Sequence, residues 1–412
     1  MKKLIFLFAF LVSNISLLFS QTWVQTLNGI AMWSICKDIQ GNIYAGTSGT
    51  THGIYKTTNG GQNWNAILSN GTSNYLGLAV DSSGNVFAAN LSNGLLISSD
   101  GGANWTTIPI ATFGGHNLQS VACGKNGYVY VGCISGGVYT STDYGQTFGV
   151  NNVTGFSVVT LYVDAFNSNK IFAGTSSSSG TVGVYISTDA GMNFSGPYNN
   201  YNVWGFVQPA PLTLYMATTS TGYPFTKTTD GGYNWATISA QPGAMRGITQ
   251  DIAGNIYICG NGGVFKSTNG GVNFLNAGLT ASGNQIVSSG NKIFATMTGS
   301  TTGGVWILTD TTLSNIHPVG EEIPDKFFLN QNYPNPFNPE TIIDFSIPED
   351  SRVSLTVYDM LGRKVSSLLD GENRKAGNYS VKFNGADIPS GIYFYKITAG
   401  SFTQTKKMIL IK

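Results

Sequence analysis

Short apolar runs rich in Val, Ile, Tyr and Thr alternate with clusters of Gly, Asn, Asp and Ser along most of this 412-residue chain. Runs of this kind, bounded by turn-forming residues, predict β-strands. In the first unit the runs cover residues 32–38, 43–47, 54–57 and 64–68. No helical periodicity separates them, so the pattern predicts an all-β chain.

A polar motif returns about every 40 residues and divides the runs into units. Its pattern is Ser/Thr-x-Asp/Asn-x-Gly-x-Asn/Thr-aromatic, with copies beginning at Thr57, Ser98, Ser141, Ser187, Thr228 and Ser267. A second element, Gly-Asn-Ile-Tyr at residues 41–44, keeps the same period and has seven versions. A fixed period of this length marks a repeat architecture. Four strands per unit then predict a seven-bladed β-propeller over residues 21–315.

The third position of the motif holds a short polar side chain, at Asn59, Asp100, Asp143, Asp189, Asp230 and Asn269. Such a side chain accepts hydrogen bonds from backbone N–H groups in a turn, here the turn between the third and fourth strands. The motif glycine tolerates positive φ, and the final Trp or Phe can fill the gap between neighbouring blades. Because scaffold elements repeat in every unit, we interpret these residues as structural.

The seventh unit is incomplete, because its motif has decayed around Asp310 and no fourth strand follows. Residues 22–27 begin with Trp, like the outer strands of other units. We expect this N-terminal segment to supply the missing strand and to close the ring, which hides sheet edges.

The repeated motif resembles the bacterial neuraminidase repeat, or Asp-box, of sialidases, xyloglucanase-type glycosidases, sortilin-like receptors and photosystem assembly propellers. The resemblance covers about residues 21–315 and implies the propeller fold. It implies no particular activity, because function resides in sites carried by a fold.

The two ends of the chain differ from the repeats. Residues 1–20 combine Lys2 and Lys3 with a short apolar run, which predicts a secretory signal peptide and not a membrane span. Residues 321–412 hold 22 of the 41 charged residues, and this shift in composition marks a second domain. We expect a linker over 316–326 and a small Ig-like β-sandwich over 327–412, with strands near 341–347, 353–358, 379–383, 392–398 and 403–411.

This second domain resembles the C-terminal sorting domain of cargo of the type IX secretion system. The similarity lies in Asn-Tyr-Pro-Asn-Pro-Phe-Asn-Pro at 332–339, Val-Tyr-Asp-Met-Leu-Gly-Arg at 357–363, Pro-Ser-Gly-Ile-Tyr at 389–393 and the basic, apolar tail at 406–412. The resemblance implies Sec export to the periplasm and then type IX secretion to the medium or the outer-membrane surface. An ordinary adhesive sandwich is the alternative.

Several chemistries lack support in the sequence. Four cysteines, Cys36, Cys123, Cys133 and Cys259, all fall in expected strands and are interpreted as buried free thiols. Three separated His residues and the absence of Cys-x-x-Cys or His-Glu-x-x-His argue against a zinc site. No P-loop is present, and a net charge of +1 does not indicate nucleic-acid binding. We therefore expect no cofactor, no metal, no nucleic-acid partner and no transmembrane segment.

Acidic residues decide the question of catalysis. Glycosidases usually need two carboxylates, about 5–9.5 Å apart. Residues 1–320 contain no Glu and nine Asp, of which four share one turn position and five belong to the motif or its decayed copy. The same region has one arginine, Arg246, whereas sialidases use three to hold a carboxylate. We expect no catalytic residues, although a divergent polysaccharide hydrolase stays open.

Candidate ligand-binding residues lie five positions before the repeated turn Asp on each inner strand. These positions hold Trp33, Leu76, Gln119, Val159, Trp204 and Arg246, with Gln285 as an approximate seventh. Nearby loops add His52, His116, Tyr198, Tyr201 and Tyr223. Aromatic rings and an arginine at one rim suit stacking on sugars or holding a peptide, whereas blade packing and a solvated charge are the alternative. The sequence thus predicts a secreted or surface-bound, non-catalytic propeller that binds a glycan or a protein, or else a structural surface component.

Overall fold

The computed structural model describes residues 22–412 apart from 50–52, 70–73, 126, 151–154, 178–181, 221, 223, 252–253, 300, 310–326, 333 and 375–376. The chain divides into two compact units, Met1–Leu313 and Ser314–Lys412, and each is described by itself. The predicted signal peptide and linker lie outside the described residues. The only helix in the described part of the chain is a 3₁₀ turn, η1 (Ile110–Phe113).

The described residues of the first unit form seven antiparallel sheets, each built around an inner strand and a second and third strand that follow it along the chain. The inner strands are β2 (Met32–Lys37), β6 (Tyr75–Val80), β10 (Leu118–Cys123), β14 (Ser157–Val163), β17 (Val203–Ala210), β21 (Met245–Gln250) and β25 (Gly283–Ser289). The second strands are β3 (Ile43–Thr47), β7 (Val86–Asn90), β11 (Val129–Cys133), β15 (Ile171–Ser176), β18 (Thr213–Thr218), β22 (Ile256–Gly260) and β26 (Lys292–Met297).

The outer parts of the sheets are shorter. The third strands are β4 (Ile54–Thr57), β8 (Gly94–Ser98), β12 (Gly137–Ser141), β16 (Val184–Ser187), β19 (Pro224–Thr228), β23 (Gly263–Ser267) and β27 (Gly304–Thr309). The fourth strands are β5 (Asn65–Leu68), β9 (Thr106–Pro109), β13 (Gly149–Val150), β20 (Ala236–Ala240), β24 (Leu275–Leu279) and, from the N-terminus, β1 (Trp23–Thr26).

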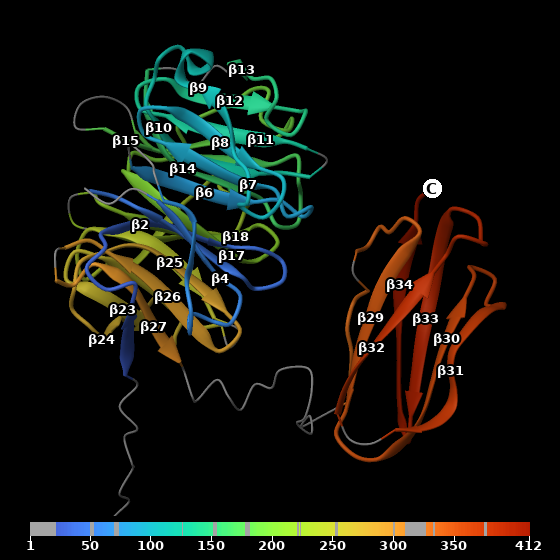
Figure 1. The fold of residues 1–412 in the computed structure, drawn as a ribbon. Coiled ribbons are helices and arrows are strands. Elements are labelled where there is room, and N and C mark those ends of the chain that lie inside the picture. The colour runs from blue at the N-terminus through green and yellow to red at the C-terminus, as the bar shows by residue number, and fades with distance from the viewer. Residues whose placement is uncertain are drawn as a thin grey trace, which may run out of the picture. The chain divides into compact units, whose positions relative to one another are not determined.

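The inner strands form a closed ring. Each contacts the inner strand of the next sheet, and β25 contacts β2. In Figure 1 the blue first sheet accordingly lies beside the orange last sheet. Antiparallel sheets whose inner strands form a closed ring make a β-propeller. The sequence prediction of an all-β propeller is therefore confirmed. The number of seven blades stays a prediction, which the seven described sheets support.

The last sheet takes its outer strand from the N-terminus. Strand β1 pairs antiparallel with β27, with Trp23 opposite Leu308 and Thr26 opposite Val305. The Trp23 indole is buried and donates a hydrogen bond to the Ala277 carbonyl oxygen at 2.8 Å, on the outer strand of the preceding sheet. The N-terminal segment thus joins the last two sheets.

The fourth sheet differs from the expected pattern of four strands. Its described part contains β14, β15 and β16 only, followed by an isolated bridge between Ile186 and Ser195. Pro197, between Ser195 and Tyr198, has no N–H to donate, and this edge keeps only separate bonds to β16, such as Tyr198 N to the Val184 carbonyl oxygen at 2.9 Å. The prediction of four strands in every unit is wrong at this position.

The six polar motifs form six turns of the same geometry, at 57–64, 98–105, 141–148, 187–194, 228–235 and 267–274, hereafter the repeated turns. In each, the Ser/Thr hydroxyl donates to Oδ1 of the Asp or Asn at 2.7–2.9 Å. The same hydroxyl accepts from the N–H of the motif glycine at 2.8–2.9 Å. Oδ1 accepts from a second backbone N–H at 2.9–3.0 Å. These side chains therefore replace backbone pairing that the turn interrupts.

The repeated turns also join neighbouring sheets. In the sixth turn, Gly271 has φ +89° and lies so close to Phe225 of the preceding sheet that a Cβ atom would collide with the ring. The terminal aromatic Phe274 packs edge-on against the same ring, with centroids 4.9 Å apart. A residue with no side chain followed by a large aromatic lets the turn fit between two blades.

The second unit is a sandwich of two antiparallel sheets. One has the order β28 (Phe328–Leu329), β29 (Glu340–Ile347), β32 (Gly377–Asn384), and the other β31 (Lys364–Arg374), β30 (Ser351–Tyr358), β33 (Gly391–Ala399), β34 (Phe402–Leu410). Buried residues of both sheets share one core. The buried Asn332 donates to Thr341 Oγ1 at 2.9 Å, and Asn335 Oδ1 accepts from Ile409 N at 2.9 Å. The Asn-Pro-rich motif therefore ties the start of the domain to its strands.

Candidate functional site

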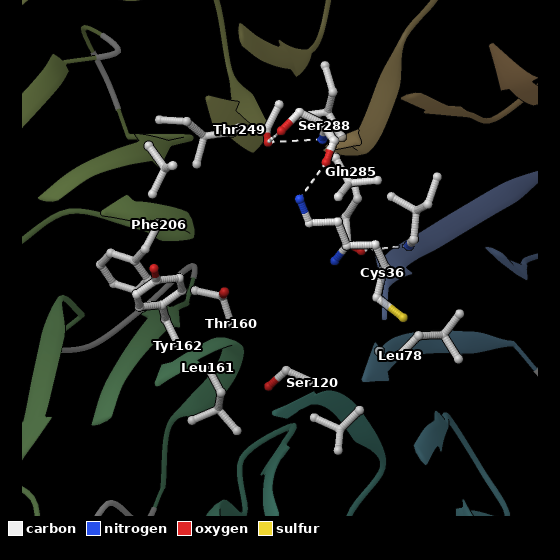
Figure 2. Close-up of a pocket in the computed structure, with 18 of the residues that line it drawn as sticks. Cys36, Leu78, Ser120, Thr160, Leu161, Tyr162, Phe206, Thr249, Gln285 and Ser288 are labelled. Carbon is white, nitrogen blue, oxygen red and sulfur yellow. Dashed lines mark hydrogen bonds between the residues drawn. The ribbon is translucent and has the colours of Figure 1, made fainter. Parts of the chain in front are cut away.

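A channel runs between the inner strands. Its cavity measures about 490 Å³, and all seven inner strands contribute to the wall. Figure 2 shows the rings of Tyr162 and Phe206 side by side, with Thr249, Gln285 and Ser288 across the cavity from them. A second cavity of about 180 Å³ shares part of this wall and adds Trp204 and Arg246. We call the region of this second cavity the channel mouth.

Every inner strand carries a register shift close to its start, and the shifts coincide with the positions that the sequence analysis aligned. The residues skipped by the pairing are Trp33, Leu76, Gln119, Val159, Trp204, Arg246 and the pair Asn284 and Gln285. A β-bulge leaves one residue unpaired and redirects its side chain. Bulges of this kind explain how one position per blade projects away from the regular alternation of the strands.

The bulges bring three of the predicted residues together. The Arg246 guanidinium carbon lies 5.4 Å from the ring centre of Trp204 and 5.6 Å from that of Trp33. The cation is therefore in cation–π contact with two indoles at once, Trp204 from the neighbouring fifth sheet and Trp33 from the first sheet, which follows the seventh in the ring. All three side chains are half-buried. The interpretation that these residues occupy one rim agrees with these distances, and their use in binding stays a proposal.

A buried amide holds the arginine in place. Arg246 Nη1 donates to Asn284 Oδ1 at 3.1 Å, and Asn284 Nδ2 donates to the Met32 carbonyl oxygen at 3.2 Å. Because the Asn284 amide is used at both ends and is 1% exposed, its orientation is settled. The sequence analysis missed Asn284, since the seventh strand could be aligned only approximately, at its neighbour Gln285.

Two donors at the channel mouth lack partners in the described part of the chain. They are Arg246 Nε and Trp204 Nε1, both buried. Gln285 lies in the same wall, and its Oε1 accepts from Ile35 N at 3.0 Å. An unsatisfied buried N–H costs free energy, so the mouth has unused capacity to donate hydrogen bonds.

The other candidates are more scattered. Gln119 sits at its bulge but lines neither cavity. His116 packs against Gly136, and Tyr201 packs against the hydrophobic cluster between the fourth and fifth sheets, together with Tyr198. Tyr223 and His52 lie outside the described residues. The structure thus brings together Trp33, Trp204 and Arg246, and does not add the loop residues to their cluster.

All eight described Asp side chains of the propeller are engaged in turns. Asp100, Asp143, Asp189 and Asp230 belong to the repeated turns, and Asp38, Asp81, Asp164 and Asp251 accept from backbone N–H groups at the ends of inner strands. The pairings of Met32 with Thr47 and of Ile43 with Thr57 place both kinds of turn at the end of the sheet opposite the channel mouth. No described carboxylate lines either cavity.

Burial shifts the pKa of three titratable groups in the channel wall towards the neutral form. Lys37 Nζ donates to the Ser288 carbonyl oxygen at 2.7 Å, and burial lowers the pKa of this lysine. Burial, with a contribution from Asp164, raises the pKa of Tyr162 to about 12. Burial also raises the pKa of the Cys36 thiol, and Asp38 adds to the effect. A thiol held in its protonated form is a poor nucleophile.

The four cysteines are free. Cys133 and Cys259 are buried as expected, whereas Cys36 and Cys123 are half-buried. Among the described residues, no group of three or more His, Cys, Asp or Glu side chains could hold a metal ion. No helix in the described ranges has the length and apolar character needed to cross a membrane.

The C-terminal unit identifies the class of protein. Residues 331–412 match the model of the secretion system C-terminal sorting domain. A propeller joined to such a domain is a protein exported by type IX secretion, to the cell surface or into the medium. No curated protein matches the sequence.

Solved structures with the same fold include three informative ones. YCF48, solved bound to a D1 peptide, is 15% identical with a TM-score of 0.56, over 70% of this chain and 96% of that chain. PorZ, a surface component of the type IX secretion system of Porphyromonas gingivalis, is 13% identical with a TM-score of 0.52, over 93% of this chain. The BT4673 extracellular domain from B. thetaiotaomicron is 9% identical with a TM-score of 0.53, over 95% of this chain.

This chain spans 59% of the length of PorZ and of the BT4673 structure. At such identities the likeness establishes the fold, because one fold carries many functions. The chain is therefore similar in fold to surface and extracellular propellers. This similarity does not show that it shares their activities.

Proposed function

We propose that this protein is an exported binding module, which holds an extracellular ligand at the channel mouth without chemically changing it. The observation that carries the proposal is the Arg246 guanidinium between Trp33 and Trp204, an arrangement in which Arg246 Nε and Trp204 Nε1 are buried and have no partner among the described residues. Groups that are desolvated, oriented and yet unsatisfied are suited to a ligand. Such an arrangement serves scaffolding poorly, since the free donors cost stability.

The position of the acids supports binding over hydrolysis. Two-carboxylate chemistry needs both groups at one site, whereas the described propeller carboxylates accept hydrogen bonds in turns at the far end of the sheets. Cys36, the thiol in the channel wall, has a raised pKa because it is buried. A site rich in donors and poor in bases favours recognition.

The ligand is a protein segment or a glycan. YCF48, a propeller of the same fold, has been solved with a bound peptide. That example supports a peptide as ligand for this channel, although the two chains are only 15% identical. Indole faces at the mouth also suit sugar rings. Export by type IX secretion places the binding site outside the cell, where both kinds of ligand occur.

The proposal is tested with the full-length protein on immobilised plant, microbial and host glycans and on a peptide panel, with retention and release of reducing sugar measured together. We expect saturable retention without release of sugar, lost in Trp204→Ala. Tyr144→Ala is the matched control, because Tyr144 is an aromatic side chain 47% exposed in a repeated turn, at the opposite end of the sheets. Release of sugar would refute the absence of catalysis, and retention unchanged in Trp204→Ala would refute the site.

A further inference from the structure

We infer that the channel mouth recognises a carboxylate of a peptide ligand, with Arg246 and Trp204 as the groups that hold it. This inference rests on the proposed function, because it names the chemical group that the same site accepts. It follows from the charge of the mouth, the number of donors and the character of the wall beside them.

The charge at the mouth has no counterion among the residues that the structure describes. Arg246 is the single arginine of residues 1–320. The described propeller carboxylates lie in turns at the other end of the sheets, and none lines the cavities. The Arg246 guanidinium donates to a neutral amide, Asn284 Oδ1, at 3.1 Å. A half-buried guanidinium without a carboxylate is a strong site for an anion, since desolvation strengthens the attraction.

The donors outnumber the acceptors around this cation. A guanidinium has five N–H groups, and one bond to Asn284 Oδ1 accounts for one of them. Trp204 Nε1 and Arg246 Nε are buried and have no hydrogen-bond partner in the described ranges of the chain. Asn284 cannot turn to offer more, because its Nδ2 donates to the Met32 carbonyl oxygen. An anion with two oxygen atoms fits a fork of N–H groups with an indole N–H beside it.

The contacts already made by the two indoles favour a peptide over a sugar. The wall of the smaller cavity combines the apolar side chains of Ile35, Leu161, Phe206, Ile248 and Ile286 with the polar groups of Thr160, Tyr162 and Gln285. The Trp33 and Trp204 rings are already in contact with the guanidinium. The indole faces that meet the guanidinium are therefore not open to stacking on a sugar ring, whereas an apolar residue that adjoins a carboxylate can contact the aliphatic part of the wall while the carboxylate meets Arg246.

The test uses the full-length protein labelled with ¹⁵N at tryptophan, since the indole N–H of Trp204 reports directly on a new acceptor. Its resonance is assigned by its loss in Trp204→Phe, which keeps an aromatic ring. The probes are acetyl-Gly-Ser-Gly-Leu with a free C-terminus, the same peptide amidated, and amidated acetyl-Gly-Ser-Glu-Leu. A galacturonic acid oligosaccharide is the fourth probe.

We expect the free-acid peptide, the glutamate peptide or both to shift the Trp204 signal saturably, and which of them does so identifies the source of the carboxylate. The fully neutral amidated peptide should bind roughly 10- to 100-fold more weakly, the range for a hydrogen bond to a charged group. Arg246→Gln should cause the same loss. Lys266→Gln, which removes a cation 5.2 Å from the Tyr257 ring on the same sheet, should not.

Three results would overturn the inference. One is equal binding of the neutral peptide, which would leave the proposed binding function intact. Another is a shift caused by the oligosaccharide alone. The third is that neither carboxylate peptide shifts the Trp204 indole signal at about 10 mM. The panel of glycans and peptides described above decides separately whether the mouth binds any ligand. Should Arg246→Gln fail to fold, Arg246→Lys keeps the charge but loses the fork and should weaken binding by a smaller factor.

Discussion

The repeated turns are predicted to stabilise the propeller through one hydroxyl each, and Ser141→Ala tests this in the third turn. Ser141 is 1% exposed. Its Oγ donates to Asp143 Oδ1 at 2.7 Å and accepts from Gly145 N at 2.8 Å and from Asp143 N at 3.3 Å. The variant removes all three contacts without adding bulk.

The size of the effect follows from these contacts. Leaving the buried Gly145 N–H without an acceptor costs about 1–3 kcal/mol. Loss of the hydrogen bond to Asp143 adds about 1 kcal/mol, less than is usual for a charged acceptor because water screens this carboxylate. We therefore expect Ser141→Ala to lower the free energy of unfolding by about 2–4 kcal/mol. Ser141→Thr is the matched control, since Thr57 and Thr228 occupy the same position in two other turns. It should change stability much less than Ser141→Ala does, because the hydroxyl keeps its hydrogen bonds.

Urea unfolding followed by tryptophan fluorescence measures this free energy in the full-length protein. All seven tryptophans precede residue 320, so the signal reports on the propeller and not on the sorting domain. A Ser141→Ala variant as stable as wild type would refute the role of the hydroxyl. Equal loss of unfolding free energy in Ser141→Thr and Ser141→Ala would show that the fit of the side chain at position 141, and not its hydroxyl, determines stability.

Three further predictions concern other parts of the chain. Gly271→Ala should destabilise the propeller by several kcal/mol or prevent folding, because the new methyl group meets the Phe225 ring at a positive φ; thermal unfolding measures this, and unchanged stability would contradict it. Hydrogen bonds from Thr147 and Ser141 lower the pKa of Asp143 to about 2, so its stabilisation is present above pH 4 and is lost as the pH falls through about 2; Asp143→Asn should flatten this part of the pH profile of stability, and an unchanged profile would refute the assignment. Tyr395→Phe should destabilise the sorting domain by about 1–3 kcal/mol, since its buried hydroxyl accepts from Asn332 N and donates to the Asn330 carbonyl oxygen, both at 2.7 Å; calorimetry of the full-length protein should show the loss in a transition that tryptophan fluorescence does not follow.

Strand order and turn chemistry could be predicted from local sequence because each unit repeats the same pattern of apolar runs and turn residues. The runs at 32–38, 43–47 and 54–57 correspond to β2, β3 and β4 within one residue. Strand β31 was not among the runs identified in the sorting domain, because Asp370, Gly371 and Glu372 interrupt its apolar pattern. Pairing with β30 along the sheet maintains this strand despite its weak local signal.

The candidate site could be predicted only in part. Counting back from the turn Asp located Trp33, Trp204 and Arg246 at equivalent positions, since the inner strands share one register. Their mutual contact depends on a bulge in each strand and on the spacing of sheets around the ring, neither of which appears in the sequence of a single unit. Tyr201 was grouped with them because it is an aromatic residue in a nearby loop, whereas the structure packs it against a blade core.

The central claim, that a ligand binds at the channel mouth, is tested most directly by binding isotherms of the full-length wild type, Arg246→Gln and Lys266→Gln with the ligand that the panel retains best. The two variants lose the same charge. Arg246→Gln loses cation–π contacts with two indoles and Lys266→Gln loses one with Tyr257, but only Arg246 lines the mouth. The account predicts that Lys266→Gln binds like wild type and that Arg246→Gln binds at least about tenfold more weakly. Three coincident isotherms would contradict it.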